Sequence, residues 1–380
     1  MDCKNQRKKS YKKTFENSKG IAFVNVVLFA FIALATIIII TLIVNDMSSN
    51  KKAETADNSI NSNKVIISKN ATTNTNETNN VKLNNNIINS NQTGIDEKNT
   101  IYSEYYYNQL DSNAKSMYST IIKNIPSLKS GTDKIEFELS QSNIENSFQS
   151  AWDAICLDRP EIFYIDTKKL TLITQTNTSI FGNVKYKYMI QPQEGKNYFI
   201  DTWATAQDAQ NSIDDVEKVA NNIVSKASGS TYDKVKYIHD KIIDNVEYDQ
   251  TNYINNSNIY GALIKNTAVC EGYAETFKYL ADKLNLESVI VYGNGADEEG
   301  NSEFHAWNEV KMDDGKWYAI DTTWDDPIII GGGKVSASSK YKNFLKGSKT
   351  FFKQHTNVSD VSGTGQNFKY PELSEDDFKK

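Results

Sequence analysis

The chain has 380 residues, of which 42 are Lys or Arg and 48 are Asp or Glu, so its formal net charge is −6. An acidic chain lacks the positive surface that binds phosphate backbones, and we therefore expect no nucleic-acid partner. Only three cysteines are present, Cys3, Cys156 and Cys270, so no disulfide framework is expected and folding must depend on a hydrophobic core.

The N-terminal segment carries the signals of a membrane anchor. Lysine and arginine are concentrated in residues 1–20, and an almost unbroken apolar run follows from Ile21 to Val44. A run of about 24 residues is long enough to cross a bilayer as a helix, and no small-residue cleavage site follows it. By the positive-inside rule the basic tail stays cytoplasmic and the rest of the chain lies outside. We predict a single-pass membrane protein with an extracellular C-terminal part.

Residues 45–100 are rich in Asn, Ser, Thr and Lys and contain few large apolar side chains, as in NATTNTNETNNVKLNNNIINSNQT. Such a composition does not bury enough surface to offset the entropy of ordering, so we expect a disordered tether. From residue 101 onward, aromatic residues become frequent and the patterns of helices and strands alternate. We divide this part into an α+β region at 101–230 and a second domain at 231–380.

Hydrophobic periodicity predicts the elements of the first region. We expect helices at 112–125 and 142–156, and strands at 134–139, 170–174 and 184–191. Cys156 lies in the second of these helices among apolar residues at helical spacing, as SFQSAWDAICLD shows. We therefore expect its side chain to be buried in the core.

Two longer helices follow, at 206–225 and 231–246, the second with an apolar stripe. His239 lies between the apolar positions of that helix among charged neighbours, so we expect a surface or packing histidine. The sequence contains no repeat, glycine-rich phosphate loop or metal-ligand spacing, and it therefore predicts neither a metal nor an organic cofactor.

The segment NTAVCEGYAETFKYLADKLNLE indicates a loop that enters a helix near Cys270, with Tyr273, Phe277 and Leu280 at helical spacing. The aligned dipoles and free N–H groups of a helix N-terminus favour an anion, so a thiolate forms there more readily than in water. The same N–H groups are placed to hold an oxyanion. A cysteine at a helix start is weak support by itself, and a base is needed.

The segment NSEFHAWNEVKMDDGKWYAIDTTWDDP indicates two strands around a turn, with His305 on the first strand and Asp321 near the end of the second. In a Cys-His-Asp group the histidine takes the thiol proton and the carboxylate orients the ring. The two-residue turn that is favoured locally would put His305 and Asp321 on opposite faces. We therefore predict a three-residue loop at 313–315, with Gly315 left-handed, that brings both side chains to one face.

The motifs AVCEGYAETFKYL and HAWNEVKMDDGKWYAIDTTWDDP together resemble the transglutaminase-like superfamily, and YIHDKIIDNVEYD resembles the helix before the nucleophile in that family. The resemblance covers residues 234–327. It implies a papain-like, transglutaminase-like α+β core in which the helix of the nucleophile packs on an antiparallel sheet. Cys270 would be the nucleophile, His305 the base and Asp321 the orienting carboxylate. Calcium, which some animal relatives use, is not expected because no acidic ligand loop stands out.

Four further side chains are candidates for binding the substrate or its oxyanion. Trp307 and Trp324 are expected to flank the site and exclude water, although packing against the sheet explains them equally well. Glu271 adjoins the nucleophile and is a candidate substrate contact. Tyr260 is a candidate hydroxyl donor to the oxyanion, with core packing as the stronger alternative. His355, in the tail segment TFFKQHT, has no partner in the sequence, and we expect it to be structural.

An acyl-thioenzyme is resolved by water or by an amine, so the three residues fit both a cysteine peptidase and a transglutaminase. Outside a membrane the nearby amide bonds are those of peptidoglycan stems and surface proteins, and water competes well unless the site excludes it. We therefore expect hydrolysis of amide bonds in a peptide, protein or peptidoglycan substrate. The alternatives are cross-linking of glutamine side chains to amines, and a catalytically inactive wall- or protein-binding module.

Overall fold

The computed structural model describes residues 102–125, 130–139, 145–178, 184–251, 253–297, 300–326, 337–358 and 367–380. The predicted tail, membrane span and tether, at 1–20, 21–44 and 45–100, lie outside these ranges. Among the helices within them, none is both long and apolar enough to cross a bilayer.

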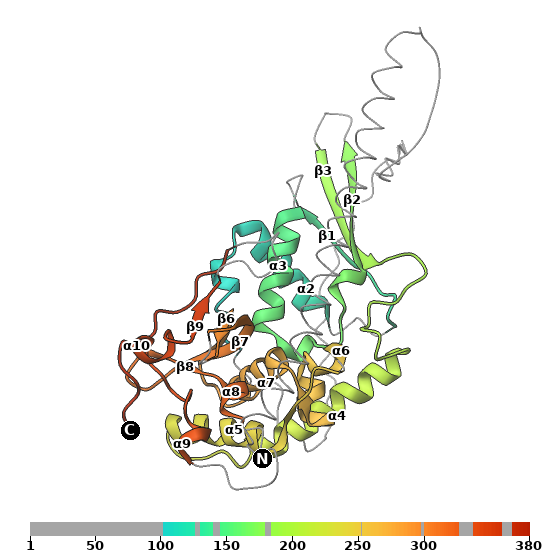
Figure 1. Ribbon diagram of the computed structural model, residues 1–380. Helices are drawn as coiled ribbons and strands as arrows, with labels where there is room; N and C mark the ends of the chain where they lie inside the picture. Colours follow the sequence, from blue (N-terminus) through green and yellow to red (C-terminus); the bar gives the residue numbers. More distant parts are fainter. Residues whose placement is uncertain are drawn as a thin grey trace, which may run out of the picture. The chain divides into compact units, whose positions relative to one another are not determined.

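The first part of the described chain combines two helices with an antiparallel sheet (Figure 1). Its elements are α2 (Ser112–Asn124), β1 (Ile135–Leu139), α3 (Glu145–Asp158), β2 (Leu170–Thr178) and β3 (Val184–Pro192). The strands pair in the order β1-β3-β2. In β3 the alternate residues Tyr188 and Ile190 are buried, which is the period of two that a half-covered sheet requires. The helices and strands predicted for this region are confirmed, with small shifts of their ends.

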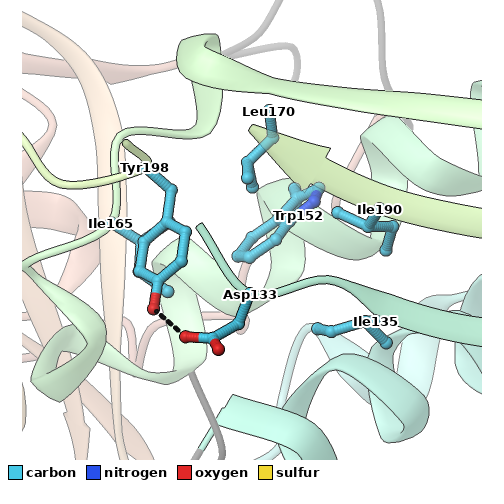
Figure 2. A pocket seen from close by; sticks show the side chains of 7 residues that line it. All are labelled: Asp133, Ile135, Trp152, Ile165, Leu170, Ile190 and Tyr198. Carbon is cyan, nitrogen blue, oxygen red and sulfur yellow. Dashed lines mark hydrogen bonds between the residues drawn. The ribbon is translucent and has the colours of Figure 1, made fainter. Parts of the chain in front are cut away.

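A small cavity lies in this first part, lined by residues from α3, the sheet and the connecting loops (Figure 2). Its volume is about 10 Å³, and its lining consists of Asp133, Ile135, Trp152, Ile165, Leu170, Ile190 and Tyr198. The hydroxyl of Tyr198 donates to the carboxylate of Asp133 at 3.2 Å. Such a volume holds about one water molecule, so this cavity is a packing gap and too small for a substrate.

Helices α4 (Ala206–Val224) and α5 (Thr231–Asn245) follow, and each begins with a capping box. Thr205 and Ser230 accept from the backbone of the third helical residue, whose carboxylate accepts in return from the cap. Both predicted helices are confirmed. Both pack on α7 (Cys270–Lys283), from either side of the predicted boundary at residue 230. The division into two domains stays a prediction.

The central helix α7 lies on a four-stranded antiparallel sheet (Figure 1). The strand order is β8-β7-β6-β9, with bounds β6 (Ser288–Ala296), β7 (Ser302–Lys311), β8 (Trp317–Ile320) and β9 (His355–Asn357). Tyr273, Phe277 and Leu280 of α7 are fully buried, because their spacing keeps them on one face of the helix. The expected mixed fold, with the helix of Cys270 on an antiparallel sheet, is confirmed. Strands β6 and β9 were not predicted.

Short elements connect these layers and place the loop before Cys270. They are η3 (Tyr107–Gln109), η5 (Pro160–Ile162), η6 (Thr167–Lys169), β4 (Glu247–Tyr248), α6 (Tyr253–Asn256), the π-helical turn η7 (Gly261–Lys265), β5 (Thr267–Ala268), α8 (Thr322–Asp325), α9 (Ala337–Lys340) and α10 (Ser348–Phe351). Strands β4 and β5 pair in parallel. Val269 then donates its backbone N–H to the carbonyl of Asn256 at 2.8 Å, which fixes the residue that precedes Cys270.

Buried charges in the first part of the chain interact electrostatically with buried charges of α7. Lys278 and Asp282, one helical turn apart, form a fully buried ion pair at 2.5 Å. Asp158, at the end of α3, accepts from the backbone N–H groups of Tyr106 and Tyr107 at 3.1 and 2.8 Å. Burial raises the pKa of Asp158 and of Asp282 to about 7, while the Lys278 charge opposes the rise. Removing Lys278 would leave buried carboxylates without their cation, which is strongly destabilising.

Candidate active site

Cys270 is the first residue of α7, where the chain leaves β5. Val269 occupies the cap position and has no side chain that accepts a hydrogen bond, so the first N–H groups of the helix are not capped by it. The Cys270 side chain is partly exposed. A thiol at this position meets both the dipole of the helix and solvent.

His305 and Asp321 come to one face of the sheet through the register of β7 and β8. Lys311 pairs with Trp317 and Asn308 with Ile320, so the connecting loop has an odd number of residues. Met312 donates to the carbonyl of Lys316 at 2.9 Å, and Gly315 has a φ of 77°, which favours glycine. The predicted three-residue loop is therefore confirmed, and the two-residue turn is excluded.

Asp321 follows β8 and is the cap residue of α8, and its side chain is completely buried. Its Oδ1 accepts from the backbone N–H of Trp324 at 3.0 Å. Its Oδ2 accepts from Nε2 of His305 at 2.8 Å. One carboxylate thus caps a helix with one oxygen and orients an imidazole with the other.

His305 also hydrogen-bonds the side chain of Cys270. Because Asp321 occupies Nε2, the ring nitrogen left for the thiol is Nδ1. Burial by itself lowers the pKa of His305, but the charge of Asp321 and the hydrogen bonds to Asp321 and Cys270 raise it to about 10. Burial likewise raises the pKa of Asp321, yet its two histidine partners outweigh this effect and hold that pKa well below its usual range. The imidazole is thus in place to exchange a proton with the sulfur of Cys270.

Two tryptophans enclose the imidazole. The ring of Trp324 stacks on His305 at a centroid distance of 5.2 Å and is partly exposed. Trp307 is 1% exposed and lies deeper, 6.2 Å from the His305 ring. A Cβ on Gly295 of β6 would lie 2.6 Å from Cζ2 of Trp324, so only glycine leaves room for that ring. Trp324 therefore lies beside the imidazole at the edge of the site, whereas Trp307 is packed in the core.

Of the other candidates, Glu271 lies next to Cys270 and accepts from the hydroxyl of Tyr292 at 2.8 Å. Tyr260 packs its ring against Phe163 and Trp203, at 6.4 and 5.4 Å. None of the described contacts of Tyr260 is with Cys270 or His305. The structure therefore favours core packing, the stronger of the two alternatives for this tyrosine.

Sequence reasoning missed His355. The expectation that it has no partner is wrong, because its Nε2 lies 3.0 Å from Oδ2 of Asp321, the oxygen that also binds His305. His355 opens β9, which pairs with β6. That strand is short and is separated from β6 by more than fifty residues, so no local pattern in the sequence indicated the contact.

Cys156 differs from Cys270 in surroundings and in charge. Its side chain is exposed, so the expectation of a buried residue is wrong, and both described cysteines are free. The apolar neighbours Ile155 and Leu157 occupy the core in its place. Surrounding protein still weakens the hydration of a thiolate at this position and, with nearby carboxylates, raises the pKa of Cys156 to about 12. A thiol of that kind is a poor nucleophile at neutral pH.

His305, Asp321 and His355 are also the ligand types that bind metals, and one donor atom of each lies within 4.8 Å of the others. Both histidines meet the carboxylate at 2.8 and 3.0 Å, the distances of hydrogen bonds. These contacts account for the cluster with protons alone, and the absence of a metal cofactor stays a prediction.

Comparison with known proteins agrees with the motifs. The profile of the Transglutaminase-like superfamily matches residues 217–322, a range that holds Cys270, His305 and Asp321. No curated protein sequence matches the chain.

Several solved structures are similar over parts of the chain. A structure described as a TGase has 18% identity and a TM-score of 0.28, and the match covers 56% of this chain and 56% of that one, so this chain spans just over half its length. A putative cysteine protease from Cytophaga hutchinsonii has 18% identity and a TM-score of 0.25, with 42% and 68% covered. The periplasmic domain of TgpA from Pseudomonas aeruginosa, bound to ethylmercury, has 12% identity and a TM-score of 0.23, with 50% and 73% covered.

Proposed function

Residues 217–322 belong to the transglutaminase-like superfamily, and on this basis we propose that the chain is a cysteine-dependent enzyme that hydrolyses amide bonds. The observation that carries the proposal is the continuous hydrogen-bonded series from Cys270 through His305 to Asp321. A thiol, an imidazole and a carboxylate in this order are the parts that covalent acyl transfer requires.

In the first half of the reaction the Cys270 sulfur attacks the carbonyl carbon of the amide. The carbonyl oxygen becomes an oxyanion, and the uncapped N–H groups at the start of α7 are the donors nearest to the nucleophile. His305 then gives its Nδ1 proton to the amide nitrogen, the C–N bond breaks, and the amine leaves. Asp321 holds the ring in the orientation and charge state that this transfer needs.

In the second half a water molecule attacks the thioester, gives its proton to His305, and releases the acid together with the Cys270 thiolate. Hydrolysis is favoured over cross-linking because Cys270 and Trp324 are both partly exposed, so water reaches the sulfur. An amine acceptor would have to displace this water.

We also propose that the activity lies outside a membrane, on peptide bonds of a cell wall or of surface proteins. The support for this is the apolar run from Ile21 to Val44, the basic residues before it and the long polar segment after it. In cells that express the full chain with Cys3→Ser and Cys156→Ser, a membrane-impermeant maleimide should label Cys270. Labelling only after the cells are lysed would place the site on the inner side and contradict this location.

The test of the reaction uses the full chain in detergent with purified cell wall and with a glutamine-containing protein plus a labelled amine. We expect new free amino groups from the first substrate and no incorporated label in the second. Cys270→Ala should abolish the release, whereas Cys156→Ser, at the other described cysteine, should retain it. Incorporated label would support cross-linking in place of hydrolysis. Release by Cys270→Ala at the wild-type rate would end the enzymatic proposal.

A further inference from the structure

His355 is buried in the middle of the proposed active site, although it lies beyond the segment that matches the family. Its side chain is 2% exposed, and β9 brings it opposite Gly295 of β6. Its ring stacks on Phe351 of α10 at 3.8 Å with an angle of 10° between the planes. The ring of Trp324 also contacts the imidazole, at a centroid distance of 4.5 Å. These contacts fix the plane of the imidazole, and therefore the direction of both nitrogens.

Both nitrogens of His355 point at oxygen atoms. Nε2 lies 3.0 Å from Oδ2 of Asp321, and Nδ1 lies 3.3 Å from the backbone carbonyl of Phe351. Neither oxygen has a proton to give, because Oδ2 of Asp321 already accepts from Nε2 of His305 and a backbone carbonyl only accepts. A neutral imidazole has one N–H, so one of its lone pairs would face an oxygen. A ring with a proton on each nitrogen satisfies both contacts.

The charges of the group then alternate along the hydrogen bonds. Cys270 as thiolate, His305 as imidazolium, Asp321 as carboxylate and His355 as imidazolium sum to zero. His305, Asp321 and His355 are the buried members of this series, and buried charges are tolerated when each is paired and hydrogen-bonded, as these are.

We propose that His355 is a positioning residue of the active site, whose doubly protonated ring fixes Asp321 and shares that carboxylate with His305. The inference rests on the proposed function, because it assigns His355 a part in the same reaction. His355 does not touch the reacting atoms. It acts through Asp321 in two ways. First, its hydrogen bond fixes the position of the oxygen that orients His305. Second, its positive charge weakens the attraction of that oxygen for the His305 proton.

The second effect matters for the step in which His305 releases its proton to the leaving amine. A carboxylate that serves His305 alone would stabilise the imidazolium more strongly, and proton release would become harder. The charge of His355 opposes this, at a ring-centroid distance of 5.8 Å from His305. The titratable groups that face the pair are Cys270 of α7 and Asp321, with Asp325 of α8 acting on Asp321 by its charge. The neighbouring position of β6 is Gly295, and α10 contributes Phe351.

The first experiment reads the protons of His355 directly. The chain contains three histidines, so the full chain labelled with ¹⁵N-histidine gives three pairs of imidazole nitrogen signals, and the pair lost in His355→Gln is assigned to His355. We expect both of its nitrogens to carry protons at pH 7. A single bare nitrogen at that pH would overturn the proposal.

The second experiment follows alkylation of Cys270 by iodoacetamide against pH, in a Cys3→Ser, Cys156→Ser background. Its upper inflection reports the loss of the His305 proton. Removing the positive charge of His355 should move this inflection upward by roughly one pH unit in both His355→Gln and His355→Phe. The two variants separate charge from position, because glutamine still donates to Asp321 whereas phenylalanine keeps only the ring stack.

With a hydrolysed substrate in hand, His355→Phe should lower kcat by about 10- to 100-fold through the loosened Asp321, and His355→Gln should recover most of that loss. An unchanged inflection in the folded Gln variant would reduce His355 to a packing residue. A wild-type profile that changes on dialysis against a chelator would place a metal ion between the rings and also overturn the proposal. The alkylation and NMR readings need no substrate, so they stand apart from a failure to find hydrolysis.

Discussion

Two histidine–aspartate pairs meet the short helix α8. Asp321 at its start serves His305, and Asp325 at its end serves His239 of α5, at 2.8 and 3.2 Å. Both histidines are buried, with exposures of 2% and 0%. Burial lowers the pKa of each ring, and carboxylate partners raise it above the ordinary value in both cases.

The two pairs differ in what the second ring nitrogen meets. Nδ1 of His239 lies 3.1 Å from a carboxylate oxygen of Asp240, so both of its nitrogens are engaged by acids. The second nitrogen of His305 is left for the thiol of Cys270. A buried histidine held by an aspartate is therefore not by itself evidence of a catalytic site. It becomes a candidate for chemistry when one nitrogen remains for a reactant.

The largest effect should come from Asp321→Asn, which keeps the volume of the side chain and removes its charge. We expect hydrolysis to fall by about 10⁴-fold, because the neutral amide no longer fixes the tautomer and charge of His305. The matched variant Asp325→Asn, four residues along on the same turn, should lose about 10-fold at most once its folding is verified. Equal losses of kcat/KM in the two variants would show that the His305–Asp321 pair has no special role in catalysis.

His239→Gln should act on stability. The variant leaves the buried Asp325 without its cation, so we expect the free energy of unfolding to fall by about 3 kcal/mol, with the exposed Lys241→Gln of the same helix as the control.

The pH dependence follows from the direction of the shift. The folded-state pKa of His239 is raised, so its contribution is complete below the unfolded value of about 6.5 and is lost as the pH rises through the folded value. The difference in the free energy of unfolding between wild type and variant, measured by denaturant titration, should therefore decrease above that pH. A difference that increases with pH would show that the ring is neutral in the folded protein.

Gly295→Ala tests whether the packing of Trp324 on His305 matters for activity. The added Cβ would come within 2.6 Å of Trp324 and 3.4 Å of Cδ2 of His305, so the tryptophan must move. We expect kcat to drop by about 10- to 100-fold from the disturbed imidazole. In a Trp324→Ala background the same substitution should cost little more, since the clash is gone. Simple additivity of the two losses would argue against the contact.

The smallest effect is expected for Tyr260→Phe. The ring packs on Phe163 and Trp203 and keeps these contacts when the hydroxyl is removed, so rates should stay within a factor of about three of wild type. A loss of about 10²-fold in kcat would instead identify the hydroxyl as an oxyanion donor. Thermal unfolding of the variant separates that outcome from a general loss of structure.

The sequence predicted the parts of the site that depend on local pattern. Helical spacing placed Cys270 at the start of α7, and the parity of the residue numbers across the hairpin gave the loop length that joins His305 and Asp321 on one face. Both arguments use only neighbouring residues and the repeats of helix and strand. They needed no knowledge of how distant segments meet.

Long-range pairing accounts for what was missed. His355 reaches Asp321 only because β9 pairs with β6, and a strand of three residues leaves almost no periodic signal. Cys156 lies within a predicted helix, but which side of α3 faces the core depends on its neighbours in space. The cap formed by Asp321 on α8 was likewise hidden, because the residue was interpreted only as the end of a strand.

The hairpin between β7 and β8 makes the spacing of the chain as important as the identity of its residues. Asp313 and Asp314 can change while His305 still faces Asp321, since substitution leaves the pairing of Met312 with Lys316 intact. Inserting or deleting a single residue there would turn Asp321 to the other side of the sheet. Such a change in loop length would leave Cys270, His305 and Asp321 in the sequence but would separate Asp321 from His305 in the folded protein.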